Sequence, residues 1–311
     1  MKKLNKIVCV ALSFLLLATL VGVSVVWVLN SSVNDVALSF LENVLPFDCK
    51  QYDIKLESAS PSNGEHKILT YFLESKDSTI HIIFTIQNDN VAMVYSNVNR
   101  GSAICDETYN SSLIEAAKSL LQKYQIYTSR DSSKFIEVLS EINSVENSTT
   151  TKGDIKLVVV HDNLTGTVFG DLVNFSWMQT VNGCDYSFFS ISFKDGVFHA
   201  LTDNRVMYTL GDTSVNVSKE EAVAIALDAI KSYSYSMADD WLVSDFVVRD
   251  DKIEAVLYPQ TKENNVWYPA WSVILPLDGV YPGSVRELLV GIWAGTGEVY
   301  LVHHQAYSGF P

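Results

Sequence analysis

The sequence predicts an α+β fold that follows one N-terminal transmembrane helix, and three observations support this prediction. The chain opens with lysines and a long apolar run. A pattern that begins helices then occurs three times, and short segments of alternating apolar and polar residues follow each occurrence. We therefore expect about three units, each built from a helix packed on antiparallel sheet.

The apolar run covers residues 7–29. These 23 residues carry no charge and no proline, and a helix needs about 20 residues to cross the bilayer core. Three lysines come before the run, and basic residues stay on the cytoplasmic side. The lysines are Lys2, Lys3 and Lys6. We expect a cytoplasmic basic tail at residues 1–6, a signal anchor at 7–29 that contacts the lipid bilayer, and an extracytoplasmic remainder in a single-pass cell-membrane protein.

A cleaved signal peptide is the alternative for this run. The apolar region of a signal peptide normally spans about 7–15 residues and leads to an A-x-A-like cleavage site. Here the run is longer, and no A-x-A follows it. Both alternatives place the rest of the chain outside the cytoplasm.

Beyond the anchor the chain is acidic. Without the three N-terminal lysines it has 19 Lys and Arg against 36 Asp and Glu, a net charge of −17 with histidine neutral. Such a surface repels phosphate backbones, so we expect no nucleic-acid partner. The acidic residues are spread along the chain, which favours a role in solubility.

Three cysteines lie beyond the anchor, where disulfides can persist. Their odd number allows at most one pair within the chain. We favour a Cys49–Cys105 disulfide, because both residues flank the same predicted β-rich unit, and this pairing leaves Cys184 as a buried thiol. No C-x-x-C spacing occurs, so the cysteines indicate neither a redox dithiol nor a zinc site.

N-glycosylation sequons are more frequent than the about 3 expected by chance. This surplus favours a glycoprotein. Beyond Asn30, which lies next to the anchor, the candidate acceptors are Asn110, Asn147, Asn163, Asn174 and Asn216.

Each predicted unit opens with a capping box, in which a serine side chain accepts a hydrogen bond from a backbone N–H three residues later. Apolar residues at helical spacing follow each box. The boxes pair Ser32 with Asp35, Ser112 with Glu115, and Ser218 with Glu221. With the polar loops as boundaries, the units cover residues 30–108, 109–212 and 213–311.

Segments with strand character follow each helix, and turn residues separate them. In the first unit they cover 68–73, 79–86 and 91–98. In the second unit a further helix near 133–145 precedes strands at 155–161, 167–178 and 186–193, and Asp195-Gly196 predicts a hairpin turn into 197–201. In the third unit they cover 242–249, 252–257, 267–275, 287–293 and 298–303, with a turn at 295–297.

The last unit resembles a PepSY domain. Ser218–Ala222 and Ala224–Leu227 are similar to its opening helix, Trp271–Val273 to its aromatic strand, and Ile292–Val299 to its closing hairpin. Ala294 stands where the family often has an acid. The resemblance implies a small α+β module that regulates or inhibits peptidases or binds other partners, and it carries over no catalytic residue.

Motifs for catalysis are missing from the sequence. It has no H-E-x-x-H, G-x-S-x-G, phosphate loop or dinucleotide fingerprint. His303 and His304 are the one adjacent histidine pair, and neighbouring residues of a strand point to opposite faces, so they cannot easily share a metal. We therefore expect no catalytic residue, no cofactor and no metal site.

Aromatic residues are dense near the C-terminus, and Trp and Tyr are favoured anchors for protein partners. Trp267, Tyr268 and Tyr281 lie beside prolines at predicted strand ends, so we expect them to be exposed and to bind a partner. We expect Trp271 and Trp293 to fill the core between helix and sheet.

These features favour a membrane-tethered, extracytoplasmic binding or regulatory module. It would recognise or inhibit a peptidase or another envelope protein without catalysis of its own. One alternative is an extracytoplasmic hydrolase whose dispersed site uses His161 or His199. Another is a passive structural component of the envelope.

Overall fold

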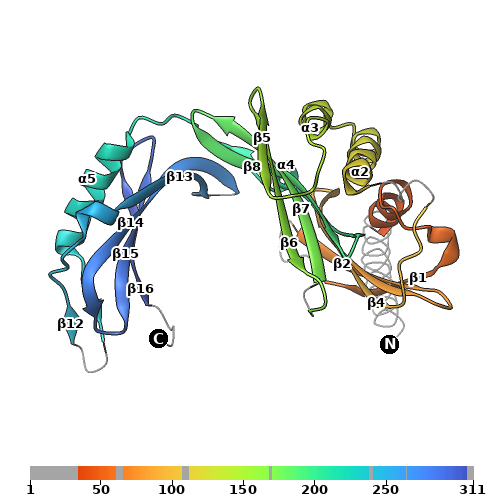
Figure 1. Cartoon of the computed structure of the whole chain (residues 1–311), viewed down its shortest axis with the longest axis horizontal. Helices are drawn as coiled ribbons and strands as arrows, with labels where there is room; N and C mark the ends of the chain where they lie inside the picture. Colours follow the sequence, from red (N-terminus) through yellow and green to blue (C-terminus); the bar gives the residue numbers. More distant parts are fainter. Residues whose placement is uncertain are drawn as a thin grey trace, which may run out of the picture. The chain divides into compact units, whose positions relative to one another are not determined.

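The computed structural model describes residues 34–60, 66–106, 112–167, 170–237, 241–263 and 265–306. The chain forms two compact units (Figure 1). The first comprises Met1–Ser148, Val158–Phe175 and Phe189–Val206, and the second comprises Thr149–Leu157, Ser176–Phe188 and Met207–Pro311.

The predicted α+β fold of about three helix-plus-sheet units is wrong. The chain is mostly β-sheet, and the strands expected for the first two units belong to one nine-stranded sheet of order β1-β2-β3-β4-β9-β8-β7-β6-β5. β4 and β9 join the two halves of this sheet where Val94 pairs with Leu201. Periodicity identifies single strands, but it does not identify a partner about a hundred residues away, because packing decides that pairing.

The strands of this sheet are long, and their bounds are as follows. They are β1 Asp53–Ala59, β2 His66–Glu74, β3 Thr79–Gln87, β4 Asn90–Arg100, β5 Ser148–Lys152, β6 Ile155–Leu164, β7 Gly170–Val181, β8 Cys184–Lys194 and β9 Val197–Asp203. The predicted turn at Asp195-Gly196 joins β8 to β9, and both turn residues have positive φ, as such hairpins require.

Helices pack on the first part of this sheet. A helix over residues 34–43 buries Phe40, whose ring meets Phe84 of β3 and Tyr124 of α2. α2 runs over Leu113–Thr128, and the side chain of its N-cap Ser112 accepts a bond from Glu115 N, which confirms the predicted helix start. α3, Ser133–Leu139, ends before the predicted residue 145.

A buried ionic group lies beneath α2. The carboxylate of Asp203 at the end of β9 is fully buried. Arg205 in α4 (Asn204–Met207) donates to it through Nε at 2.9 Å and a terminal nitrogen at 3.0 Å. Tyr124 donates its hydroxyl to the same carboxylate. A buried charge needs such partners, so this group fixes α2 to the end of the sheet.

The predicted membrane span at 7–29 lies outside the described residues. Within those residues no helix has both the length and the apolar composition to cross a membrane.

From Met207 onward the second unit forms a five-stranded sheet with the helix α5, and parts of β5 to β8 complete the unit. The sheet follows the order β10-β14-β15-β16, with β13 also paired to β14. The bounds are β10 Thr209–Leu210, α5 Lys219–Ala229, β13 Glu254–Thr261, β14 Val266–Tyr281, β15 Val285–Trp293 and β16 Val299–Ala306. Two short strands, β11 Tyr235–Ser236 and β12 Leu242–Val243, pair apart from it, so the predicted strand at 242–249 is reduced to two residues.

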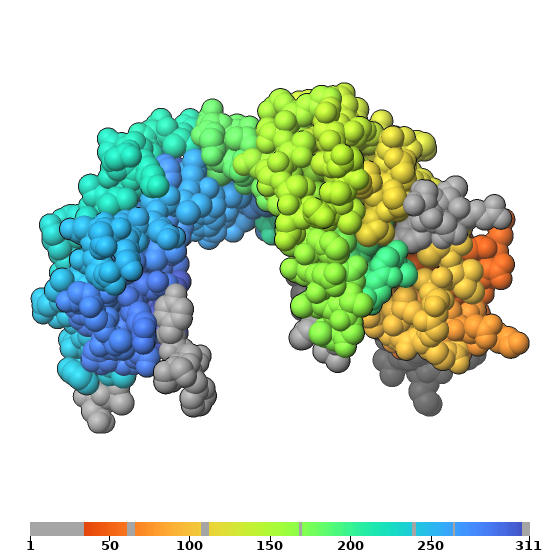
Figure 2. All heavy atoms as spheres, in the orientation of Figure 1, coloured from red at the N-terminus to blue at the C-terminus, as the bar shows by residue number. Residues whose placement is uncertain are grey.

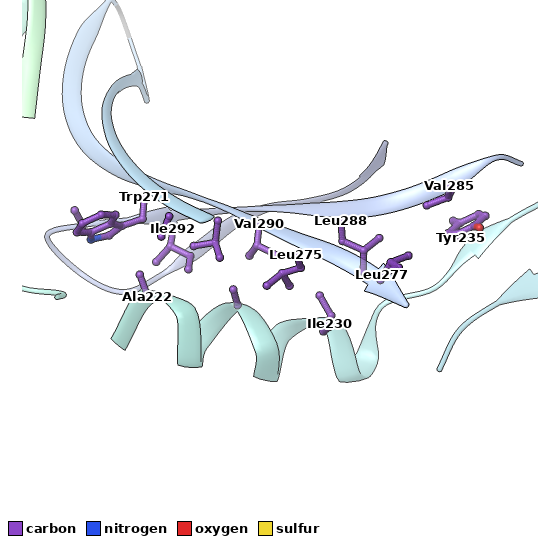
Figure 3. Close-up of a cluster of buried hydrophobic side chains, with 14 of the residues drawn as sticks. Ala222, Ile230, Tyr235, Trp271, Leu275, Leu277, Val285, Leu288, Val290 and Ile292 are labelled. Atoms are coloured by element: carbon purple, nitrogen blue, oxygen red, sulfur yellow. The ribbon is translucent and has the colours of Figure 1, made fainter. Parts of the chain in front are cut away.

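α5 lies along one face of this sheet and closes its core (Figure 3). Ser218 and Glu221 form the predicted capping box. Ala222 of α5 and Ile230, directly after the helix, point towards the sheet, where Trp271 lies among aliphatic side chains. The core position of Trp271 is therefore confirmed, and its indole Nε1–H donates to Val217 O at 2.9 Å. In space-filling form the described residues of this unit from Met207 onward, coloured teal to blue, form a compact body (Figure 2).

Candidate functional site

The sheet of the second unit presents a second face, opposite α5. Cross-strand register places alternate residues of β13 to β16 on it, and together we call them the open face. Ser272 and His303 are among its polar members, and its apolar and aromatic members include Tyr258, Tyr268, Ala270, Ile274, Leu289, Gly291, Trp293 and Leu301. Leu301 is 39% exposed and the neighbouring Val256 is 57% exposed. Within this unit the open face thus keeps large apolar side chains in contact with solvent.

A pocket of about 330 Å³ lies at one end of the open face, and we call it the Trp293 pocket. Three parts of the chain meet there: the end of β15, the first residues of β14, and the segment that follows β10. Ala294 N donates to Pro269 O at 3.0 Å, and Gly211 N donates to Trp267 O at 2.9 Å. The lining residues are Asp212, Lys262, Glu263, Tyr268, Pro269, Trp293, Gly295 and Thr296.

Aromatic rings meet edge to face at this pocket. The ring of Tyr268 is nearly perpendicular to the Trp293 indole, at 75° with 6.0 Å between centroids. Tyr300 packs against the same indole at 4.5 Å, and its hydroxyl hydrogen-bonds to that of Tyr258. Burial raises the pKa of Tyr300, so this hydroxyl stays protonated. The rings therefore hold Trp293 in one orientation.

Two glycines make room for these rings. A Cβ on Gly211 would come within 2.4 Å of the Tyr268 ring, and a Cβ on Gly291 within 2.4 Å of Tyr300. Real Cβ atoms do not approach so closely, so only glycine lets both rings lie on the backbone. The positions of the pocket rings thus depend on two residues that have no side chain.

The pocket also carries charge. The Lys262 ammonium stands over the Trp293 ring at 5.4 Å from its centroid. It also pairs with Glu298 at 3.8 Å. Asp212 accepts two hydrogen bonds from Ser214, which hold the pKa of its carboxyl below the usual value. Asp212 is therefore ionised at neutral pH.

The three predicted partner-binding aromatics are not brought together. Tyr268 lines the pocket. Trp267, the residue before Tyr268 in β14, points to the other face of the sheet. It is 9% exposed and stacks on Tyr208, with 4.4 Å between the ring centroids. Tyr281 lies at the far end of β14, packs on Phe246 at 5.3 Å and accepts a bond from Val247 N.

Trp293 lies on the opposite face of the sheet from the one that the sequence predicts. We expected it between helix and sheet, but it pairs with Ala270 on the open face. Alternation from Trp271, which pairs with Ile292, would have given this face. No local pattern in the sequence brings Lys262 or Asp212 to the same pocket.

The cysteines of the described residues, Cys49, Cys105 and Cys184, are free thiols, and Cys184 is buried as predicted. Cys49 and Cys105 lie on neighbouring segments, since Cys105 bridges to Phe47 and Asp48 N donates to Ile104 O at 3.0 Å. Burial raises the pKa of both thiols to about 11. Their pairing stays a prediction.

The candidate glycosylation sites differ in exposure. Asn147, Asn163 and Asn216 are exposed, whereas Asn174 is half-buried. The Asn216 amide donates to Gly295 O at 2.9 Å. Asn110 lies outside the described residues.

Both histidines of the hydrolase alternative lie in the first unit. His161 pairs with Asp171 at 2.7 Å. His199 lines a separate pocket of about 310 Å³ together with Lys194 and Asp195. Its Nδ1 contacts Ser96 O at 3.0 Å, while the Ser96 hydroxyl donates to Phe198 O at 2.6 Å. The Ser96 hydroxyl is thus bonded to backbone rather than to an imidazole.

In the part of the chain that the structure describes, no group of three or more His, Cys, Asp and Glu side chains is placed to hold a metal ion.

Comparison with solved structures gives a distant likeness. No family model and no curated protein matches the chain. Among solved structures it is similar to the Bacillus megaterium YpeB C-terminal domain, with 12% identity and a TM-score of 0.35, over 88% of this chain and 96% of that chain. A likeness this distant does not establish a shared fold, so the resemblance to PepSY domains stays a prediction from the sequence.

Proposed function

We propose that the protein is a binding module without catalysis of its own, and that it recognises a protein or peptide partner through the open face of its second unit. The observation that carries this proposal is the Trp293 pocket. Its rings are already held in place, and the same face of the sheet carries the part-exposed Leu301. Rigid Trp and Tyr rings lose little conformational entropy on binding, which is why they dominate binding hot spots.

The sheet edges support a role in peptide recognition. β13 and β16 bound the paired strands β14 and β15, and β16 carries the part-exposed Leu301. An extended peptide can add a strand to such an edge through backbone hydrogen bonds, while pockets select its side chains. A peptide on this face would reach the Trp293 pocket from β16, because Tyr300 of that strand touches the indole.

We further propose that residues 7–29 anchor the protein and that the partner is a peptidase or another envelope protein outside the membrane. The basic and apolar pattern of the N-terminus supports this location. Carbonate washing should leave the full chain in the membrane fraction, and protease added to intact cells should cleave the part beyond residue 30. Release by carbonate, or full protection from protease, would contradict the location.

Photo-crosslinking of the full chain in its membrane tests the binding proposal. A photoreactive amino acid in place of Leu301 should give a discrete cross-linked band, because this side chain lies on the open face. The matched control is Ile126, which is 81% exposed on α2 of the first unit. No band at Leu301, or the same band at both positions, would overturn the proposal.

A further inference from the structure

We propose that the Trp293 pocket receives a basic side chain, arginine or lysine, from the bound partner, and that Lys262 occupies this position until the partner arrives. This inference rests on the proposed function and names the chemistry that the pocket selects.

The first support is the indole itself. The face of a tryptophan ring attracts a cation within about 6 Å of its centroid. Lys262 Nζ already lies 5.4 Å from the Trp293 centroid. The pocket therefore holds a cation on its ring in the structure, and that cation belongs to the chain itself.

The second support is the surplus of acid. Three carboxylates, those of Asp212, Glu263 and Glu298, line the pocket or contact Lys262, which is the one base among these residues. The local balance is −2, and the whole chain carries −14. Ser214 donates two hydrogen bonds to Oδ1 of Asp212, and these bonds favour the charged form of the carboxyl group. The carboxylates would repel an anionic ligand. A guanidinium group could instead pair with a carboxylate and stack on the Trp293 ring.

The third support is the weak hold on Lys262. Its side chain is 44% exposed, and its ion partner Glu298 is 65% exposed at a distance of 3.8 Å. Exposed pairs at this distance contribute little to stability. Lys262 can therefore turn into solvent when a partner's side chain enters, at small cost to the fold.

A sugar ring is the other ligand that Trp and Tyr rings commonly stack on. A sugar would not require the surplus of acid, and Lys262 would not compete with it for a cation site. The test must therefore separate a charged probe from a neutral one of the same shape.

The experiment uses the full chain in nanodiscs of neutral lipid, labelled with 5-fluorotryptophan. The Trp293 signal in the fluorine NMR spectrum is assigned with Trp293→Phe. The probes are three Gly-Ser hexapeptides that differ at one central position, which holds arginine, citrulline or glutamate, and the disaccharide cellobiose. The arginine peptide should shift the Trp293 signal in a saturable way, and the other probes should not.

Lys262→Met provides the sharpest comparison. Removal of the competing ammonium should tighten binding of the arginine peptide about two- to fivefold, the range that a cation–ring contact supplies. Because Lys262 is half-exposed, this variant should keep the fold. The double variant Asp212→Asn/Glu263→Gln should weaken binding by a similar factor.

Each other outcome overturns the inference. Citrulline that binds as well as arginine would remove the role of charge, and a cellobiose shift without an arginine shift would assign the pocket to a sugar. Weaker binding in Lys262→Met would make Lys262 a ligand contact rather than a competitor. If the Leu301 cross-link persists in any of these cases, the proposed function stands while the cation chemistry fails. Absence of that cross-link when the photoreactive residue at position 301 is the single change would contradict the proposed function.

Discussion

The ring of Tyr300 lies directly on the backbone of Gly291. A Cβ at residue 291 would come within 2.4 Å of the ring carbon that bears the hydroxyl. Tyr300 in turn packs on Trp293 at 4.5 Å. A glycine that contacts no ligand therefore sets the position of the indole, and the shape of the pocket depends on it.

Gly291→Ala should therefore destabilise the second unit. An added methyl in a packed contact costs about 1–3 kcal/mol, because the ring must move off its rotamer. Unfolding in urea, followed by fluorescence, measures this loss. Gly279→Ala is the matched control, since it lies in the same sheet with nothing within 4 Å of its added Cβ. Equal midpoints for the two variants would show that the Tyr300 contact is not tight.

Asp203→Asn should destabilise the first unit by about 3–5 kcal/mol, the usual cost of removing one charge from a buried pair. The fully buried carboxylate bonds to Arg205 and Tyr124, and the variant leaves the guanidinium without its counter-charge. Asp228→Asn provides the control. Asp228 pairs with Lys231 at a side-chain exposure of 79%, and its loss should change stability by less than about 1 kcal/mol.

Stability should fall as the solution is acidified, in part through His304. This imidazole stacks on Tyr235 at 4.2 Å, and burial lowers its pKa below the ordinary 6.5. The unfolded chain therefore binds the proton more readily than the folded one, so stability is full above pH 6.5 and falls as pH drops towards the folded pKa. Melting temperatures between pH 7.5 and 5 should drop less for His304→Asn than for the unmodified protein.

A profile for His304→Asn that matches the unmodified protein would exclude His304 as a source of the acid sensitivity.

Local signals in the sequence account for the elements that were predicted well. Ser218 and Glu221 lie three residues apart, and their bonds begin α5 whatever the rest of the chain does. The turn at 295–297 follows from glycine, since Gly297 has φ +76°. Trp271 reaches the core because strand alternation places it towards α5.

The features that could not be predicted from the sequence depend on contacts between distant segments of the chain. No local pattern near Tyr95 indicates that β4 pairs with β9 at Ala200. The same pattern would suit an edge strand of a separate sheet. The Trp293 pocket likewise joins Asp212, Lys262 and Thr296 from three segments. Asp212 reaches the pocket because β10 pairs in parallel with β14, and that pairing covers just two residues. A contact this short leaves no periodic pattern to detect.

Cys49 and Cys105 should form one disulfide when the protein is made outside the reducing cytoplasm. Cys105 bridges to Phe47, two residues before Cys49, so the two segments already lie together. Closure of this loop should stabilise the first unit by about 2–4 kcal/mol. Mass spectrometry of a non-reduced digest should find the 49–105 linkage and an unmodified Cys184. A linkage through Cys184, or alkylation of both Cys49 and Cys105, would contradict it.

The dissociation constant of the captured partner tests the central claim most directly. Tyr268→Ala removes a ring of the Trp293 pocket and should weaken binding by about tenfold or more, as loss of an aromatic anchor does. Ile126→Ala, on the first unit, should leave the constant unchanged. Equal affinities for Tyr268→Ala, Ile126→Ala and the unmodified protein, with equal unfolding midpoints, would show that the partner does not bind the open face.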